Sequence, residues 1–184
     1  LLALKLKPGD EVITTPITFC ATANAVLYNG ADIKLADIDP KTLNIDLKEI
    51  EKKITKKTKA IMLIHVLGTS TNMTKLLKIV KKYKLDLIED TCESLGAKYD
   101  KKNLGTFGRF GTYSFYYSHQ ITSGEGGMIV CNDSNDYNVL KSLRSHGWSR
   151  DTDLHNSFRK NYKNLDDRFL FIGPGYNVRP PDIQ

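Results

Sequence analysis

Cysteine is scarce in this sequence, and long apolar runs are missing. The 184 residues include three cysteines, Cys20, Cys92 and Cys131, which lie far apart. Because their number is odd and their spacing wide, they predict neither a disulfide framework nor a metal site. The simplest compartment for such cysteines is the reducing cytoplasm. No stretch approaches the roughly 18 consecutive apolar residues of a membrane-spanning helix, so we expect no membrane association.

The sequence also lacks an initiator methionine and a closing element. Its start, Leu1–Pro8, is too short and too interrupted for a secretory signal and is typical of the end of a helix. Its last residues, 180–184, complete no predicted helix or strand. We therefore expect an internal piece of a longer protein.

An excess of positive charge raises the question of nucleic-acid binding. The formal net charge is +6 at pH 7, which permits such binding. No aromatic residues interleave with the lysines as a base-stacking platform requires. We interpret the lysines as a solvated helix face and expect no nucleic-acid partner. They include Lys48, Lys52, Lys53, Lys56 and Lys57, with Glu49 and Glu51 among them.

Short apolar strands alternate with helical segments, which predicts an α/β domain with a largely parallel sheet. Strands are expected at 11–15, 32–36, 60–65, 85–90, 112–115 and 127–131, and helices at 20–28, 46–54, 73–80 and from Ser134 or Asp136 to Leu143. The stretch 146–175 is polar and turn-rich with little periodicity. Its length predicts a functional loop or a subunit contact.

Two local patterns predict helix starts and turns. Asp46, with Glu49 three residues later, predicts a capping box. The glycines within 105–111 and 124–127 precede strands, so they lack the helix N-terminus of a phosphate-binding loop. We expect them to form backbone turns at positions that need positive φ.

Two residues carry the strongest chemical signals. Asp90 ends a predicted parallel strand, where α/β sheets place ligand-binding groups. A carboxylate there can pair with a protonated pyridine nitrogen, or it can simply cap the turn after the strand. His119 lies five residues after Ser114 and five before Gly124. Its imidazole can move protons near neutral pH, although a lone histidine in an aromatic loop is also typical of a structural hydrogen-bonder.

Four ordered segments together resemble the sugar aminotransferases of the DegT/DnrJ/EryC1/StrS family, which use pyridoxal 5′-phosphate or its aminated form, pyridoxamine 5′-phosphate. The segments are 16–24, 88–97, 114–127 and 175–184. The resemblance implies an aspartate aminotransferase-type (fold type I) large domain with a mixed, mostly parallel sheet flanked by helices. Residues 1–184 would form part of that PLP-binding domain, without its N-terminal segment and the small C-terminal domain. A homodimer with shared active sites is also implied.

The resemblance assigns roles to individual residues. Asp90 would bind the ring nitrogen of the cofactor, Phe19 would stack on its ring and Ser114 would hydrogen-bond its phosphate. Without the resemblance, Phe19 could equally be a core residue before a helix. Glu93 departs from the family, which commonly has glutamine or histidine there, beside the phenolic oxygen of the cofactor. The segment that begins at His65 resembles a strand end near the cofactor.

The segment 175–184 resembles the part of the family that reaches into the active site of the neighbouring subunit. Asn177 would contact the cofactor phosphate of that subunit, and Arg179 would steer an anionic substrate. Both residues could equally be ordinary polar residues of a loop.

His119 stands where the family has the lysine that binds the cofactor as a Schiff base. An imidazole cannot form that bond, and histidine at this position is the pattern of deoxysugar 3-dehydratases. One group of these carries cysteines for a [2Fe–2S] cluster beyond the glycine turn, but 144–151 and the following loop have none. The resemblance therefore implies the cluster-free group, which acts on GDP-4-keto-6-deoxy-mannose with glutamate as amino donor. The alternatives are an ordinary nucleotide-sugar aminotransferase and a non-catalytic regulatory paralogue.

Overall fold

The computed structural model describes residues 1–180, which fall into two compact units. The first is Leu1–Cys131, and the second begins at Asn132. Residues 181–184, which end the segment 175–184, lie outside the described residues. In the part of the chain that the structure describes, no helix is long and apolar enough to span a bilayer.

A six-stranded sheet forms the centre of the first unit, with the strand order β2-β1-β3-β4-β7-β8. Neighbouring strands from β2 to β7 are parallel, and β8 runs antiparallel to β7. The predicted mixed, mostly parallel sheet is therefore confirmed. The strands are β1 (Glu11–Thr14), β2 (Asp32–Leu35), β3 (Thr58–Ile64), β4 (Asp86–Asp90), β7 (Phe110–Ser114) and β8 (Gly127–Cys131).

Helices follow the strands where the apolar periodicity predicts them. The first unit contains α1 (Cys20–Tyr28), α2 (Leu47–Lys53) and α3 (Met73–Tyr83), with short 3₁₀ turns at Leu2–Leu4 and Val66–Gly68. The second unit contains α4 (Ser134–Leu143), α5 (His155–Asn161) and a 3₁₀ turn at Asp167–Phe169. The last two lie in the stretch 146–175, which the sequence marks only as irregular.

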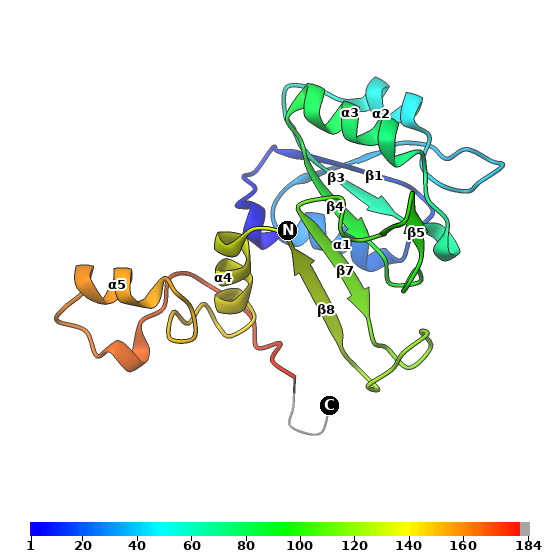
Figure 1. Cartoon of the computed structure of the whole chain (residues 1–184). Helices are drawn as coiled ribbons and strands as arrows, with labels where there is room; N and C mark the ends of the chain where they lie inside the picture. Colours follow the sequence, from blue (N-terminus) through cyan, green and yellow to red (C-terminus); the bar gives the residue numbers. More distant parts are fainter. Residues whose placement is uncertain (181–184) are drawn as a thin grey trace. The chain divides into compact units, whose positions relative to one another are not determined.

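The central strands β1, β3 and β4 are largely buried, whereas the outer strands β2 and β8 are more exposed. Figure 1 shows α2 and α3 together on one side of the sheet and α1 on the other. Ile13, Ile61 and Leu63 belong to the core cluster that also contains Ile50 of α2 and Leu76 of α3. Because side chains alternate along a strand, their neighbours in sequence face the side of α1. The sheet is thereby fixed in register, which positions its strand ends.

Two expectations about local structure are wrong in part. The Asp46 side chain accepts a hydrogen bond from Lys48 N, as a helix cap should. The return bond of a capping box does not form, because Asp46 N donates to Asp37 O and Glu49 pairs with Lys52. Helix α2 therefore begins with a simple aspartate cap.

The glycines have two different functions. Gly105 and Gly124 have positive φ, as expected, but the other glycines of 105–111 and 124–127 do not. Gly108 and Gly111 are needed for close approach instead: a Cβ on Gly108 would overlap the carbonyl oxygen of Leu87, and one on Gly111 would overlap that of Gly105. The segment before β7 thus passes directly against the sheet.

A small hairpin precedes this segment and is not predicted. It joins β5 (Lys98–Tyr99) to β6 (Lys102–Asn103) through Asp100 and Lys101, both with positive φ. Two such residues suit a tight two-residue hairpin turn. The sequence lacks the glycine that usually marks such a turn.

Candidate functional site

The candidate site lies where four parallel strands end. The carboxyl ends of β1, β3, β4 and β7 share one edge of the sheet (Figure 1), where α/β folds bind ligands. Asp90 at the end of β4 pairs in register with Ile64 of β3 and with Thr112 of β7. Ser114, two residues past Thr112, ends β7. The fold therefore brings the segments that follow Ile64, Asp90 and Ser114 to the same edge.

Asp90 lies half-buried at this edge. Its Oδ1 accepts a hydrogen bond from Cys92 N at 3.1 Å, so it does cap the turn after the strand. Burial, reinforced by the hydrogen bond to the Asp90 carboxylate, raises the pKa of the Cys92 thiol to about 12. The thiol stays protonated and is a donor toward Asp90. Capping and ligand binding are compatible, because a carboxylate has about four acceptor directions.

His119 lies half-exposed in the loop between β7 and β8. Its backbone N donates to Tyr116 O at 3.0 Å, and its ring meets the Tyr116 ring edge-on with centroids 6.2 Å apart. Among residues 1–180 neither ring nitrogen has a hydrogen bond, so the reading as a structural hydrogen-bonder gains no support. The Gln120 Nε2 atom donates to Glu93 O at 3.0 Å. The loop of His119 is thus fastened to the turn after Asp90.

The base of this loop is closed by the strands themselves. Ser114 pairs with Gly127 in the β7–β8 ladder, and Phe115 N donates to Gly126 O at 2.8 Å. The Ser114 Oγ atom accepts a hydrogen bond from Tyr116 N at 3.2 Å, which leaves its own proton to donate. Glu93 is exposed, and its carbonyl rather than its carboxylate makes the contact with the loop.

Phe19 is 77% exposed and lies just before α1, after the end of β1. The reading of Phe19 as a core residue is therefore wrong. A flat apolar ring beside the shared strand edge can cover one face of a ligand ring.

Asn177 lies in the second unit, away from any regular strand. It forms an isolated antiparallel bridge with Ser145, and its Oδ1 accepts hydrogen bonds from the Arg179 guanidinium at 3.3 and 3.4 Å. Both side chains are exposed. Their expected function in a neighbouring subunit stays a prediction.

A buried carboxylate directly before Asp90 was missed by sequence reasoning. The side chain of Glu89 is fully enclosed and accepts four hydrogen bonds, from His65 Nε2 at 2.9 Å, Gly105 N at 2.8 Å and the backbone amides of Phe107 and Gly108, each at 2.6 Å. Burial acts to raise the pKa of Glu89, but the hydrogen bonds from His65, Gly108 and Gly105 outweigh it and lower the pKa. The available signal in the sequence was an acidic residue directly after the apolar pair Leu87 and Ile88 of the strand.

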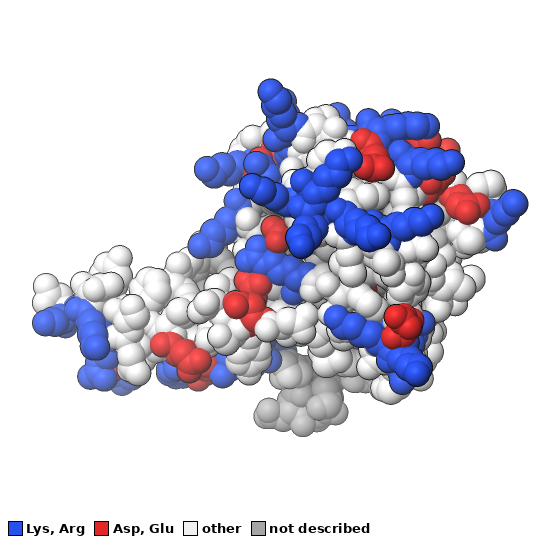
Figure 2. Space-filling view, turned by 45° about the horizontal axis from the view of Figure 1, so that its top comes forward, with Lys and Arg blue, Asp and Glu red and all other residues white. Residues whose placement is uncertain are grey.

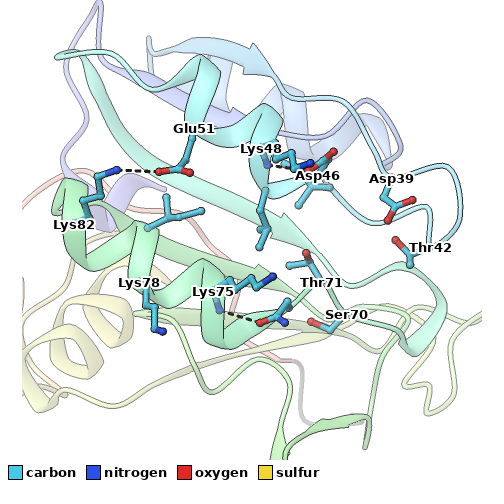
Figure 3. Close-up of a pocket in the computed structure, with 14 residues that line it drawn as sticks. Asp39, Thr42, Asp46, Lys48, Glu51, Ser70, Thr71, Lys75, Lys78 and Lys82 are labelled. Atoms are coloured by element: carbon cyan, nitrogen blue, oxygen red, sulfur yellow. Dashed lines mark hydrogen bonds and ion pairs between the residues drawn. The ribbon is translucent and has the colours of Figure 1, made fainter.

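A hollow of about 580 Å³ lies elsewhere, between α2 and α3. Figure 3 shows lysines of both helices around it, and Lys82 pairs with Glu51 at 3.1 Å. Figure 2 shows basic side chains spread over this face with acidic ones among them. Because none of the expected site residues lines the hollow, it is not the candidate site. Its charged residues are Lys48, Lys75, Lys78, Lys82, Asp39, Asp46 and Glu51.

Comparisons with known proteins identify relatives of this chain. The sequence profile of the DegT/DnrJ/EryC1/StrS aminotransferase family matches residues 1–184. The chain is 40% identical to GDP-4-keto-6-deoxy-D-mannose 3-dehydratase of Escherichia coli O55:H7 over 97% of its length and 47% of the relative. It is 42% identical to GDP-perosamine synthase of Caulobacter vibrioides over its full length and 46% of the relative. The structure of E. coli GDP-4-keto-6-deoxy-D-mannose-3-dehydratase with bound hydrated PLP has a TM-score of 0.85 and 37% identity, covering 97% of this chain and 48% of that one. The chain thus spans about half the length of the relatives it matches.

Proposed function

The chain belongs to the DegT/DnrJ/EryC1/StrS aminotransferase family, and on that basis we propose that the whole protein is a PLP-dependent nucleotide-sugar 3-dehydratase. Its substrate is a nucleotide-linked 4-keto-6-deoxy sugar, with GDP-4-keto-6-deoxy-mannose favoured by the similarity to the E. coli dehydratase. Such a reaction serves deoxysugar, lipopolysaccharide and other cell-surface polysaccharide biosynthesis. The observation that carries the proposal is His119, an imidazole without a hydrogen bond among residues 1–180, in the loop fastened to the turn after Asp90.

The residues at the strand edge fit the cofactor chemically. Asp90 offers a carboxylate for the pyridine nitrogen, Phe19 an exposed aromatic face and Ser114 a hydroxyl for the phosphate. When bound, PLP supplies an electron sink next to the reacting carbon. Asp90 keeps the ring nitrogen protonated, which that function requires. Glu93 shares the turn with Asp90, at the position where the family commonly has a glutamine or histidine beside the phenolic oxygen of the cofactor.

His119 then acts as the general base. Its ring nitrogen accepts a proton, a contribution that typically accelerates a reaction by about 10²–10⁴-fold. Because imidazole forms no lasting bond to an aldehyde carbon, the cofactor is held only by non-covalent contacts. The amino group comes from glutamate. Overall, the 4-keto sugar and glutamate give the 3-deoxy-4-keto sugar, 2-oxoglutarate and ammonia, so the oxygen lost from C3 is balanced by the one gained by glutamate.

Sharing of the site between subunits is part of the proposal. We infer a homodimer in which Asn177 and Arg179 of one subunit contact the phosphate and the anionic substrate of the other. Both residues are exposed and joined by hydrogen bonds to each other, so an amide and a guanidinium are presented together to a negatively charged partner.

The test uses the full-length protein. Incubated with PLP, glutamate and a GDP- or CDP-linked 4-keto-6-deoxyhexose, it should release ammonia only when the sugar is present. Borohydride should leave no cofactor attached to the wild-type chain, whereas His119→Lys should be labelled. Covalent labelling of the wild type would refute the proposal.

The second candidate is an ordinary nucleotide-sugar aminotransferase. The 42% identity to GDP-perosamine synthase favours it. This reading predicts an amino sugar as the product and no release of ammonia. A non-catalytic regulator would bind the cofactor or a partner but convert no sugar.

A further inference from the structure

The enclosed carboxylate of Glu89 acts as an acceptor in every direction. Its Oε1 accepts from Phe107 N and Gly108 N, and its Oε2 accepts from Gly105 N. A backbone amide can only donate, so these three contacts require acceptor oxygens. His65 Nε2, 2.9 Å from Oε2, then supplies a fourth donor. These hydrogen bonds lower the pKa of Glu89, so Glu89 is an anion that accepts hydrogen bonds from the loop 105–108 and from His65.

Glu89 and its neighbour Asp90 lie on opposite faces of β4, because side chains alternate along a strand. His65 contacts both residues: its ring binds the Glu89 carboxylate, and its backbone N donates to Asp90 O at 3.1 Å. The Ser94 hydroxyl donates a hydrogen bond to His65 O at 2.6 Å. Thr112 Oγ1 donates to Glu89 O at 3.3 Å from the other side. The backbone that carries Asp90 is thus fixed by the groups around Glu89.

Stability alone is a weak reason for this arrangement. Replacing a buried ion with well-packed apolar residues is often neutral or stabilising, and the best-supported function of buried charges is to specify one arrangement. The glycines support that view, since a Cβ on Gly108 would overlap the carbonyl of Leu87 in β4. The loop comes close enough to donate to Glu89 only because this side chain is absent.

We propose that Glu89 and His65 are positioning residues for Asp90. They hold the ends of β3 and β4 and the loop 105–108 in one register, and this register sets the direction of the Asp90 carboxylate. The inference rests on the proposed function, in which Asp90 binds the ring nitrogen of PLP. Neither residue touches the reacting atoms.

The test compares two acid-to-amide changes on the same strand of the full-length holoenzyme. Glu89→Gln replaces one acceptor oxygen with an amide NH₂ group, which then faces the backbone N–H donors of the loop 105–108. The control, Asp86→Asn, removes a carboxylate at the other end of β4 that pairs with Arg109 on the surface at 3.2 Å. Visible circular dichroism, measured at saturation and divided by bound cofactor, reports the orientation of the ring. We expect Glu89→Gln to change this signal and to weaken PLP binding at least tenfold, and Asp86→Asn to stay within twofold of the wild type.

A second pair of variants covers the case that Glu89→Gln does not fold. His65→Leu removes the donor to Glu89, whereas His65→Gln keeps one. The dichroism should change in the first variant and be largely restored in the second. If the variants melt at lower temperature with an unchanged signal per bound cofactor, Glu89 and His65 only stabilise the fold and the inference is wrong. If the wild type binds no PLP, the proposed function fails first.

Discussion

Gln120 donates a hydrogen bond from Nε2 to the carbonyl oxygen of Glu93 at 3.0 Å. This single contact joins the loop between β7 and β8 to the turn after β4. It connects the segment of the proposed base, His119, to the segment of the proposed ring-nitrogen ligand, Asp90. His119 and Asp90 belong to different segments: Asp90 ends β4, whereas His119 lies in the loop between β7 and β8.

Removal of this contact should lower turnover without abolishing it. A hydrogen bond of this kind contributes about 0.5–1.5 kcal/mol, so Gln120→Ala should reduce kcat roughly 2- to 13-fold. The exposed Ser118 of the same loop provides the control, and Ser118→Ala should leave kcat within twofold. Steady-state kinetics of ammonia release checks both. Equal effects of the two changes would show that the contact has no special function.

Phe19 should contribute to cofactor affinity through its aromatic face. Phe19→Leu keeps an apolar side chain but removes stacking that is worth about 0.5–1.5 kcal/mol, so Kd for PLP should rise roughly 2- to 13-fold. Tyr28, at the other end of α1 and 80% exposed, is the matched control. Fluorescence titration with PLP measures both. A rise for Tyr28→Leu as large as that for Phe19→Leu would contradict the assignment.

Cys92 should be unreactive despite its position beside the site. With a pKa of about 12, only about one thiol in 10⁴ is ionised at pH 8, and the thiolate is the nucleophile. Iodoacetamide at pH 8 should therefore modify Cys92 at least about 10²-fold more slowly than the exposed Cys20. Mass spectrometry of peptides after timed labelling gives both rates. Fast labelling of Cys92 in folded protein would argue against its burial against Asp90.

Glu89 should make the protein sensitive to acid. Its pKa in the folded state is lowered from its ordinary value of 4.5. Such a group contributes stability that is fully present above its unfolded pKa and is lost as pH falls through the folded pKa. Chemical denaturation of the wild type and Glu89→Gln at pH 7 and at stepwise lower pH should show their stability difference shrinking below pH 4.5. A difference that is constant with pH would mean that Glu89 is not ionised.

Helix α3 could be predicted because its apolar periodicity agrees with burial, since Met73 and Leu76 are fully buried. The boundaries of α1 and β8 match the expected residues, since Asn29–Gly30 and Gly127 mark them in sequence. Other features depend on partners distant in sequence. Asp46 N meets Asp37 O, so the return bond of the capping box has no donor left.

The enclosure of Glu89 could not be predicted for the same reason. Its four donors come from His65 and from the loop 105–108. No sequence pattern near β4 predicts that these groups lie around Glu89. Asp90 and His119 were predicted as site residues by motif, whereas their connection through Gln120 and Glu93 required the structure.

The pairing of β7 with β8 at the base of the loop of His119 does not depend on the residue at position 119. Since Ser114 and Gly127 already close the loop, a change of the residue at its tip disturbs neither strand. In the proposed function this residue is His119, so a lineage can exchange the proposed base while inheriting the same scaffold, and enzymes with different outcomes can diverge by very few substitutions.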